Sequence, residues 1–153
     1  MKNIEIERQW VVKRCDIPYS MSKYKYKKIE QGYISKEPTV RIRKADNKYF
    51  VTIKKDIDLS FMRYEFEYEI KKKDYENLKD LVISNYIVKK RYYIPYKKNT
   101  ILIDFFKDSD LILAEVEFKS KKEAENFNVP QWLKREVTNN KKYTNLYLSF
   151  KKK

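Results

Sequence analysis

Apolar and polar residues alternate along much of the chain. From Ile4 to Val12 the even-numbered positions are mostly apolar, and the odd-numbered positions begin with two glutamates and a glutamine. A period of two is the spacing of a half-buried strand, because successive side chains point to opposite faces of a sheet. The same pattern predicts further strands at residues 39–43, 49–54, 64–70, 101–105 and 113–118, and a weaker one at 88–94.

Helical spacing is confined to short stretches. From Tyr75 to Val82, apolar residues fall on one helical face. Ser120 and Glu123 fit a capping box, which predicts a second helix after Ser120. A short third helix is expected after Pro130, and the Lys/Tyr-rich segment 19–28 is ambiguous.

The strands outnumber the helices, and residues 45–48 supply turn chemistry for a hairpin between two of them. We therefore expect a mainly β (α+β) fold, in which an antiparallel barrel or strongly curved sheet has helices packed on its outside. A length of 153 residues allows one substantial core, so we expect a single domain over residues 1–153.

The net charge and the residue types that are rare or absent limit the possible partners and reaction mechanisms. The 36 Lys and Arg residues outnumber the 22 Asp and Glu, and the formal charge of +14 favours a polyanionic partner. The chain has no histidine, which excludes imidazole metal ligands and histidine-assisted hydrolysis. A lone Cys15 cannot form an internal disulfide. Without a signal-like start or a stretch of about 18 apolar residues, the protein is expected to be cytoplasmic, with no membrane partner.

Charges on the polar strand faces are sorted by sign, each at a spacing of two. Such pairs lie on one side of their strand, where like charges repel. A site for a metal-bound polyanion needs both kinds of cluster, because carboxylates hold Mg²⁺ or Mn²⁺ and Arg or Lys binds phosphate oxygens. If the sheet closes with charge inward, these groups meet in one channel. The pairs and triplet are Glu5/Glu7, Arg41/Arg43, Glu65/Glu67/Glu69 and Glu115/Glu117.

These residues resemble a known family. Residues 5–10 (EIERQW) are similar to the ExExK signature of the CYTH superfamily, the triphosphate tunnel metalloenzymes. The resemblance implies an eight-stranded antiparallel tunnel that binds triphosphates with divalent metal ions and cleaves them, or in some members cyclises ATP. It continues in order through residues 39–43, 52–54, 67–70, 91–95, Asp104, 114–118, 135–138 and 142–143.

The resemblance assigns roles residue by residue. It implies that Mg²⁺ or Mn²⁺ is bound by Glu5, Glu7, Asp104, Glu115 and Glu117. It implies that phosphates are bound by Arg41, Arg43, Lys54, Lys89, Arg91 and Lys142. Glu67 and Glu69 are further acidic tunnel residues, and either could accept the proton of the attacking water. Gln9 stands where the family has the lysine of ExExK, so one positive charge is lost from the catalytic set.

Several functions remain open at this point. Metal-assisted hydrolysis of inorganic tripolyphosphate leads, because the sorted charge suits phosphates and metals and no pocket for a base or thiazole is evident. Thiamine or nucleoside triphosphates, or cyclisation of ATP, are alternatives. Gln9 and the excess positive charge also fit a module that binds polyphosphate without turnover. Nucleic-acid binding through the segment 22–28 is less favoured, and the chain is expected to be a monomer or homodimer.

Overall fold

A computed structural model describes residues 3–57 and 61–151. The strands are β1 (Ile4–Val11), β2 (Tyr26–Ser35), β3 (Thr39–Ala45), β4 (Lys48–Asp56), β5 (Met62–Ile70), β6 (Ile87–Tyr96), β7 (Asn99–Phe106), β8 (Ile112–Glu117) and β9 (Arg135–Glu136). The α-helices are α1 (Lys72–Leu78), α2 (Lys121–Glu125) and α3 (Asn145–Phe150). Short 3-10 turns occupy Arg14–Asp16, Met21–Lys23, Lys79–Leu81 and Lys141–Tyr143.

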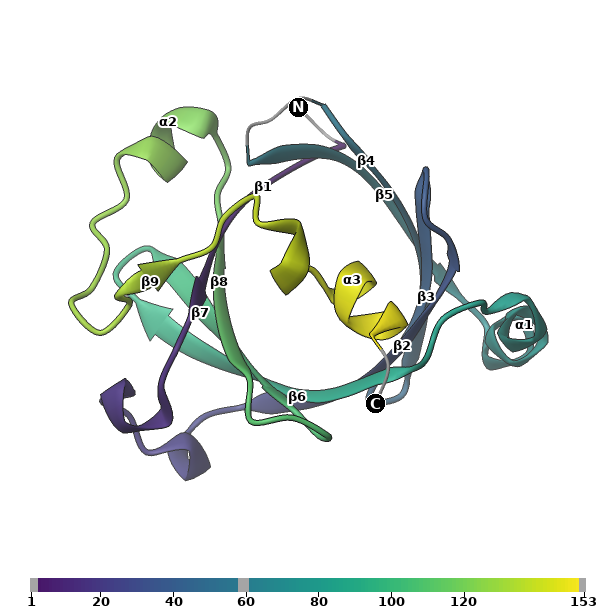
Figure 1. The fold of residues 1–153 in the computed structure, drawn as a ribbon, viewed down its shortest axis with the longest axis horizontal. Helices are drawn as coiled ribbons and strands as arrows, with labels where there is room; N and C mark the ends of the chain where they lie inside the picture. The colour runs from purple at the N-terminus through teal and green to yellow at the C-terminus, as the bar shows by residue number, and fades with distance from the viewer. Residues whose placement is uncertain (1–2, 58–60, 152–153) are drawn as a thin grey trace.

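The strands form one antiparallel sheet that closes into a barrel (Figure 1). Its order is β5-β4-β3-β2-β6-β7-β8-β1, and β1 closes the ring by pairing Ile4 with Tyr64 of β5. Further along β1, Trp10 pairs with Glu136 of the short strand β9. The predicted eight-stranded antiparallel barrel is confirmed, with one additional strand.

Alternation within the strands places polar side chains inside the barrel and apolar ones outside. Ile6, Ile103 and Val116 belong to a buried cluster that also includes Ala124 of α2. Trp10 lies in the same cluster, and its ring centroid is 6.1 Å from that of Phe127. Helix α2 packs against β1 outside the ring, so the hydrophobic core lies between the barrel wall and this covering segment (Figure 1).

Helix α1 covers another part of the outer wall, and its position confirms a helix where the periodicity predicts one; the α-helix ends at Leu78, a 3-10 turn follows, and Leu81 is exposed. Tyr75 is fully buried, and its hydroxyl donates a 2.9 Å hydrogen bond to Glu30 of β2. Beside Glu30 on the same strand lies Gly32, the single glycine of the chain. A methyl group there would lie 2.8 Å from Val82 Cγ1 and 3.0 Å from the Tyr86 ring, which is closer than packed carbon atoms tolerate.

We expect Gly32→Ala to lower the free energy of unfolding by about 1–3 kcal/mol, because Val82 and Tyr86 must move to admit the methyl group. Urea unfolding followed by circular dichroism measures the change. Lys28→Ala is the matched control on an exposed position of the same strand. An unchanged urea midpoint for Gly32→Ala would mean that the loop after α1 moves to admit the methyl group without any loss of stability.

A third helix occurs, but at a different place from the predicted one. Residues 130–133 form a turn, closed by a 3.1 Å hydrogen bond from Leu133 N–H to the Pro130 carbonyl. The predicted helix after Pro130 was wrong, because Leu133 anchors a single turn to the core and no helical run follows. The observed helix α3 starts after Thr144, whose hydroxyl accepts a 3.1 Å hydrogen bond from Tyr147 N–H.

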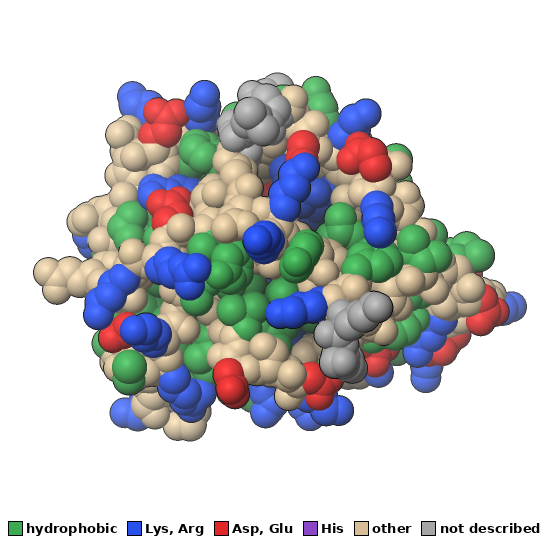
Figure 2. Space-filling view, viewed as in Figure 1, with side chains coloured by type: hydrophobic (Ala, Val, Ile, Leu, Met, Phe, Trp, Pro, Cys, Tyr) green, Lys and Arg blue, Asp and Glu red, His purple; other side chains and the backbone are tan. Residues whose placement is uncertain are grey.

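Helix α3 differs from α1 and α2 in its position. In Figure 1 the C-terminal segment, in yellow, crosses the middle of the ring of strands. Asn145 at its start contacts β2 and β6, accepting hydrogen bonds from Gln31 and Lys89. The same view in Figure 2 shows Lys and Arg side chains spread over this end of the barrel. None of the helices within residues 3–57 and 61–151 has the length and apolar character to span a membrane.

Candidate active site

The inside of the barrel holds a charged cavity of about 830 Å³. Seven strands, all of the barrel except β7, contribute to its wall, and residues of the β2–β3 turn, Phe61 and the segment from Thr138 to Lys151 line the rest. The charged side chains of its wall are Glu5, Glu7, Lys36, Glu37, Arg41, Arg43, Lys54, Asp56, Arg63, Glu65, Glu67, Arg91, Glu115, Glu117, Lys141 and Lys151. The predicted convergence of both signs of charge on one channel is therefore present.

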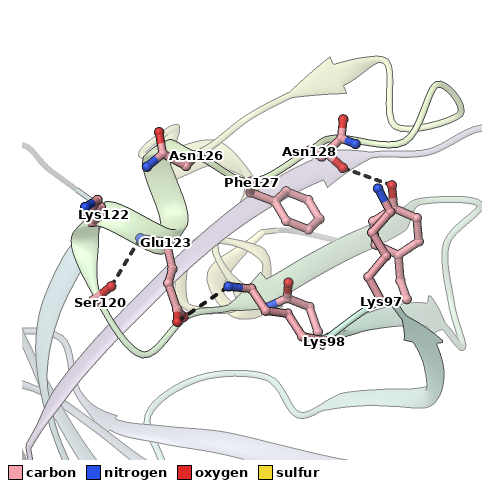
Figure 3. A pocket seen from close by; sticks show the side chains of 10 residues that line it. Lys97, Lys98, Ser120, Lys122, Glu123, Asn126, Phe127 and Asn128 are labelled. Atoms are coloured by element: carbon pink, nitrogen blue, oxygen red, sulfur yellow. Dashed lines mark hydrogen bonds and ion pairs between the residues drawn. The ribbon is translucent and has the colours of Figure 1, made fainter.

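A second pocket, of about 470 Å³, lies outside the barrel between the β6–β7 turn and α2 (Figure 3). Lys97, Lys98 and Lys122 contribute to its wall. Glu123, the one carboxylate among its lining residues, lies 3.8 Å from Lys98 and also accepts from Lys119 N–H. This pocket therefore lacks the free acidic cluster that metal-assisted chemistry needs.

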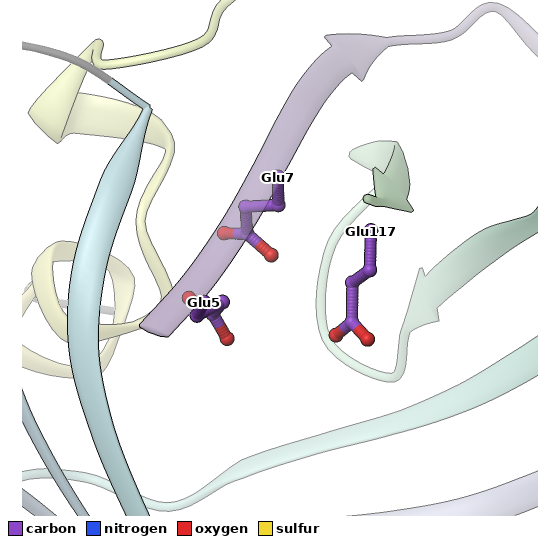
Figure 4. A group of neighbouring side chains, drawn as sticks. All are labelled: Glu5, Glu7 and Glu117. Atoms are coloured by element: carbon purple, nitrogen blue, oxygen red, sulfur yellow. The ribbon is translucent and has the colours of Figure 1, made fainter. Parts of the chain in front are cut away.

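Three carboxylates gather on the β1–β8 side of the interior cavity (Figure 4). Oxygen atoms of Glu5, Glu7 and Glu117 lie within 4.8 Å of one another, which is the spacing of ligands around one cation. Glu7 and Glu117 face each other across the β1–β8 pair. Glu5 is 7% exposed, and its Oε1 has no hydrogen-bond partner among the described residues. An orphaned, buried carboxylate oxygen beside two further carboxylates fits a divalent metal ion.

The three carboxyl groups of the cluster differ in the direction of their pKa shifts. Burial alone would raise the pKa of Glu5, but the ammonium group of Lys54 beside it lowers that pKa to about 2. Burial, together with the charges of Glu5 and Glu115, raises the pKa of Glu7 well above its usual value. Burial and Glu115 also raise the pKa of Glu117. A divalent cation would relieve this repulsion by binding the charged forms.

We expect a divalent ion to displace a proton from this cluster. Because the pKa of Glu7 is raised, its carboxyl holds a proton at a higher pH than a free glutamate, whereas a metal ion requires the carboxylate. Metal affinity should therefore rise as pH rises through that pKa. Titration calorimetry with Mn²⁺ in two buffers of different ionisation enthalpy counts the protons released. Glu7→Gln should reduce the buffer dependence, and the raised pKa of Glu117 accounts for the part that remains; buffer-independent heats from the unaltered chain would contradict the assignment.

Lys54 of β4 connects the acidic cluster to β5. Its Nζ lies 2.8 Å from Glu5 Oε2 and 3.4 Å from Glu65 Oε2. Burial would lower the pKa of Lys54, but Glu5 and the other carboxylates around it raise that pKa. Burial and the charge of Glu5 raise the pKa of Glu65 to about 7. Lys54 therefore stays charged while Glu65 can exchange a proton near neutral pH.

Arginines from β3 form the basic side of the cavity. Arg41 is 7% exposed, and its Nε has no hydrogen-bond partner among the described residues, although its Nη2 lies 3.4 Å from Thr52 and 3.8 Å from Glu67. Arg43 donates a 2.8 Å hydrogen bond from Nε to Gln31. Burial, Arg41 and Arg91 lower the pKa of Arg43 to about 9. Clustered cations with unused donors fit an anion with several oxygens.

Arg91 of β6 lies in the cavity wall, where it bonds to two carboxylates. It binds both oxygens of Asp104 at 2.8 Å and Glu115 at 2.8 Å. Lys89, with a fully buried side chain, also donates to Asp104 at 2.8 Å. Both cations lower the pKa of Asp104, against the effect of its burial. Asp104 is thus engaged by protein cations.

Gln9 lies next to the acidic cluster and links β1 to the C-terminal segment. Its side-chain amide donates a 3.3 Å hydrogen bond to the Tyr143 carbonyl. Its backbone N–H donates to Thr138 Oγ1 at 2.9 Å, and its carbonyl accepts from Val137 N–H at 2.8 Å. A neutral amide therefore occupies the position that the signature gives to a lysine, and it holds residues 137–143 across the cavity.

Comparison with known proteins identifies the family. No family model matches the chain. It is 34% identical over 128 residues to an inorganic triphosphatase of Nitrosomonas europaea, covering 79% of this chain and 83% of that protein. It is 30% identical over 120 residues to an inorganic triphosphatase of Acetivibrio thermocellus, covering 75% of each. The crystal structure of the inorganic triphosphatase NE1496 superposes with a TM-score of 0.66 at 29% identity, covering 96% of this chain and 95% of that one.

The chain belongs to the inorganic triphosphatase family of the CYTH superfamily. Membership implies dependence on a divalent metal, and the acidic cluster supplies ligands for one. Of the metal ligands that the resemblance implies, the structure brings Glu5, Glu7 and Glu117 into one cluster. Glu115 lines the same cavity but binds Arg91, and Asp104 lies behind the wall on Arg91 and Lys89.

Among the cations expected in this triphosphatase-family cavity, Arg41, Arg43, Lys54 and Arg91 line the cavity. Lys89 does not, because its ammonium group points at Asp104 and Asn145. Lys142 and Glu69 are exposed and lie outside the described cavity wall. Glu69 lies on the same face of β5 as Glu67, but at a different height along the barrel. It pairs with Phe50 of β4, beyond the charged part of the cavity wall. Glu67 does line the cavity, where it accepts from Thr52 at 2.9 Å.

Several residues of the wall were not predicted from the sequence. Thr52 and Arg63 share the parity of Lys54 and Glu65, so extending each pattern by two positions would have included them. Lys141 lines the cavity in place of Lys142. No local sequence pattern predicts the aromatic part of the wall, because its residues come from distant parts of the chain. They are Tyr33 of β2, Phe61, and Tyr147 and Phe150 of α3.

Proposed function

We propose that this member of the inorganic triphosphatase family hydrolyses tripolyphosphate with Mg²⁺ or Mn²⁺, releasing phosphate. The observation that carries the proposal is that one cavity contains a buried carboxylate oxygen of Glu5 and a buried guanidinium nitrogen of Arg41, neither of which has a hydrogen-bond partner among the residues that the structure describes. A metal–triphosphate complex would satisfy both at once. Inorganic triphosphatases at 34% and 30% identity support the same activity.

Glu5, Glu7 and Glu117 would hold the metal ion. When bound, Mg²⁺ or Mn²⁺ would neutralise phosphate charge and acidify an attacking water. Because the carboxylates come from two paired strands of a closed barrel, their positions are fixed before the substrate arrives. Fixed ligands cost little reorganisation during the reaction.

The cations would bind and orient the triphosphate oxygens. Arg41 offers an Nε without a partner in the described part of the chain, and the one hydrogen bond described for the Arg43 side chain is that of its Nε to Gln31. Lys54 would place a charge between the metal cluster and the phosphates. Such contacts stabilise the charge that spreads over oxygens as a phosphoryl group transfers.

A carboxylate of β5 is placed to accept the proton of the attacking water. Glu65 and Glu67 both line the cavity. Glu65 is the better suited of the two, because its burial raises its pKa toward the pH at which a base must cycle. Glu67 accepts from Thr52, which occupies one of its oxygens.

An organic triphosphate is the second candidate substrate, and the aromatic part of the wall favours it. Tyr33, Tyr147 and Phe150 line the cavity, and the Phe150 ring lies 4.2 Å from Lys36 Nζ. Of these rings Tyr147 is 47% exposed, and an exposed aromatic face can stack a base or a thiazole. This observation weakens the expectation from the sequence that no such pocket exists.

A substrate panel tests the proposal. Initial rates would be measured with tripolyphosphate, ATP and thiamine triphosphate, each with Mg²⁺ or Mn²⁺, and products identified by phosphorus NMR. The highest kcat/KM with tripolyphosphate, yielding phosphate and pyrophosphate, is the expected result. Cyclic AMP from ATP would indicate a cyclase. Tight binding of tripolyphosphate without any product would indicate a binding module and overturn the proposal.

Restoring the positive charge at Gln9 is expected to raise activity. Gln9→Lys places an ammonium group at the cavity wall, and one charged phosphate contact contributes about 1.5 kcal/mol, or roughly tenfold in kcat/KM. Steady-state kinetics with tripolyphosphate measures the change. Gln9→Met has similar length without charge, and is expected to be no faster than the unaltered chain. Equal gains from both variants would show that charge is not the cause.

Other expectations stay predictions. A single CYTH-like domain over residues 1–153, a cytoplasmic location, a monomer or homodimer, and the absence of a nucleic-acid partner belong to this proposal. The Lys/Tyr segment gives limited support to nucleic-acid binding: Tyr24 packs edge-on against Tyr19, and the Tyr26 ring packs in a tilted arrangement against Tyr92. Aromatic rings that are already packed have fewer free faces for bases.

A further inference from the structure

A continuous chain of polar contacts runs from helix α3 to the basic wall. Asn145 Oδ1 accepts a 3.0 Å hydrogen bond from Lys89 Nζ and another 3.0 Å bond from Gln31 Nε2. Gln31 Oε1 in turn accepts the 2.8 Å bond from Arg43 Nε. Gln31 is completely buried, and the Lys89 side chain is too. The amides of Asn145 and Gln31 thus stand between two cations from different strands.

The two cations fix the orientation of both amides. Lys89 can only donate, so Asn145 must present its oxygen to it. That oxygen also faces Gln31, so Gln31 must present its nitrogen to Asn145 and its oxygen to Arg43. Arg43 can only donate as well, so each bond is satisfied with one amide arrangement. A reversed Gln31 amide would place N–H groups against the Arg43 guanidinium.

We propose that Asn145 and Gln31 are positioning residues that hold Arg43 aimed into the triphosphate cavity. Binding of Nε by Gln31 fixes the plane of the guanidinium, and Arg43 lines the cavity. Asn145 acts through Gln31, so the start of α3 sets the geometry of a phosphate-binding residue on β3. This inference rests on the proposed function for the identity of the ligand, but the contacts themselves can be tested without turnover.

A short C-terminal helix crosses the barrel and brings Asn145 to this network (Figure 1). Helix α3 has six residues and buries Ser149, so its own packing gives it limited stability. Its first residue contributes an acceptor that neither β2 nor β6 supplies at this point. The helix would therefore complete the basic wall as well as cover the cavity.

Two variants of Asn145 test the inference. Asn145→Leu removes the acceptor, and is expected to raise KM for tripolyphosphate about five- to tenfold while kcat stays within about twofold, as for the loss of one uniform binding contact. Asn145→Asp keeps acceptor oxygens for Gln31 and Lys89, and should retain KM within about twofold. Ser149→Ala is the control on the same helix, because its hydroxyl bonds only to the Leu146 carbonyl among the described contacts; its KM should be unchanged.

Nitrogen-15 NMR provides a readout that does not depend on hydrolysis. The Arg43 Nε–H is expected to exchange slowly with water in the unaltered chain and in Asn145→Asp, and quickly in Asn145→Leu. In an Arg43→Met background, Asn145→Leu should no longer change KM. Slow Nε–H exchange in a folded Asn145→Leu, or a full KM effect without Arg43, would overturn the inference. If no substrate is hydrolysed, the proposed function fails while the exchange measurement still decides this point.

Discussion

Replacing Glu5 with glutamine is expected to lower kcat for metal-dependent tripolyphosphate hydrolysis by about 100- to 1,000-fold. The substitution keeps the size of the side chain and removes the charge of the most acidic carboxyl of the cluster, whose pKa Lys54 lowers to about 2 against the effect of burial. Oε1 of Glu5, which lacks a partner among the described residues, is the atom we assign to the metal. Steady-state rates over a range of Mn²⁺ concentrations measure the loss.

The control for Glu5→Gln is Glu76→Gln, which removes one carboxylate from α1 on the outside of the barrel. Its rates should equal those of the unaltered chain. Excess Mn²⁺ should recover only part of the activity of Glu5→Gln, because a remaining pair of carboxylates binds the ion more weakly and less accurately. Full activity in Glu5→Gln would contradict the assignment of the metal site.

Asp104→Asn is expected to cause the largest loss of stability, about 3–5 kcal/mol. Asp104 is 1% exposed and neutralises Lys89 and Arg91, each at 2.8 Å. Without its charge, the buried ammonium group of Lys89 has no anionic partner among the ion pairs described, while Arg91 keeps Glu115. Thermal unfolding followed by calorimetry should show the midpoint fall by about 10 °C.

A surface ion pair provides the comparison for Asp104. Asp16 lies 3.2 Å from Lys134, whose side chain is 67% exposed. Exposed pairs contribute little, because water and salt screen them, so Asp16→Asn should shift the midpoint by only a small amount. Equal shifts in the two variants would mean that the buried network around Asp104 contributes no more than a surface contact, against our interpretation of the site.

The strands of the barrel could be predicted where inner and outer faces differ in chemistry. Glu115 and Glu117 alternate with apolar Ala114 and Val116, so both the strand and its inward face follow from the period of two. Strand β2 escaped prediction because its faces are mixed. Its inner face carries Ile29 and Gln31, and its outer face includes Glu30, which is satisfied by Tyr75.

Parity fixes the face of a residue but not its depth in the barrel. Glu65, Glu67 and Glu69 look equivalent in the sequence, yet the first two line the cavity and Glu69 is exposed beyond it. The register of β5 against β4 decides the difference, and register depends on contacts between distant residues. The same limit applies to Lys141 and Lys142. Lys141 lines the cavity and Lys142 does not, and only the turn after Asn140 causes this difference.

The C-terminal part of the site could not be inferred from local patterns. Helix α3 is too short to produce a periodic pattern in the sequence. The role we propose for Asn145 depends on its contacts with Gln31 and Lys89, which are more than 50 residues away in the sequence. The Gln9 amide likewise bonds to the Tyr143 carbonyl across the barrel end. The departure from the ExExK signature was visible in the sequence, but its link to the covering segment required the fold.

The most direct test of the account is phosphate release from tripolyphosphate by the unaltered chain, with Mg²⁺ or Mn²⁺ and then after chelation of the metal. We expect release that stops on chelation and resumes when the metal is restored. Release that persists without a divalent ion, or no release from a folded chain that binds tripolyphosphate, would contradict a metal-dependent triphosphatase.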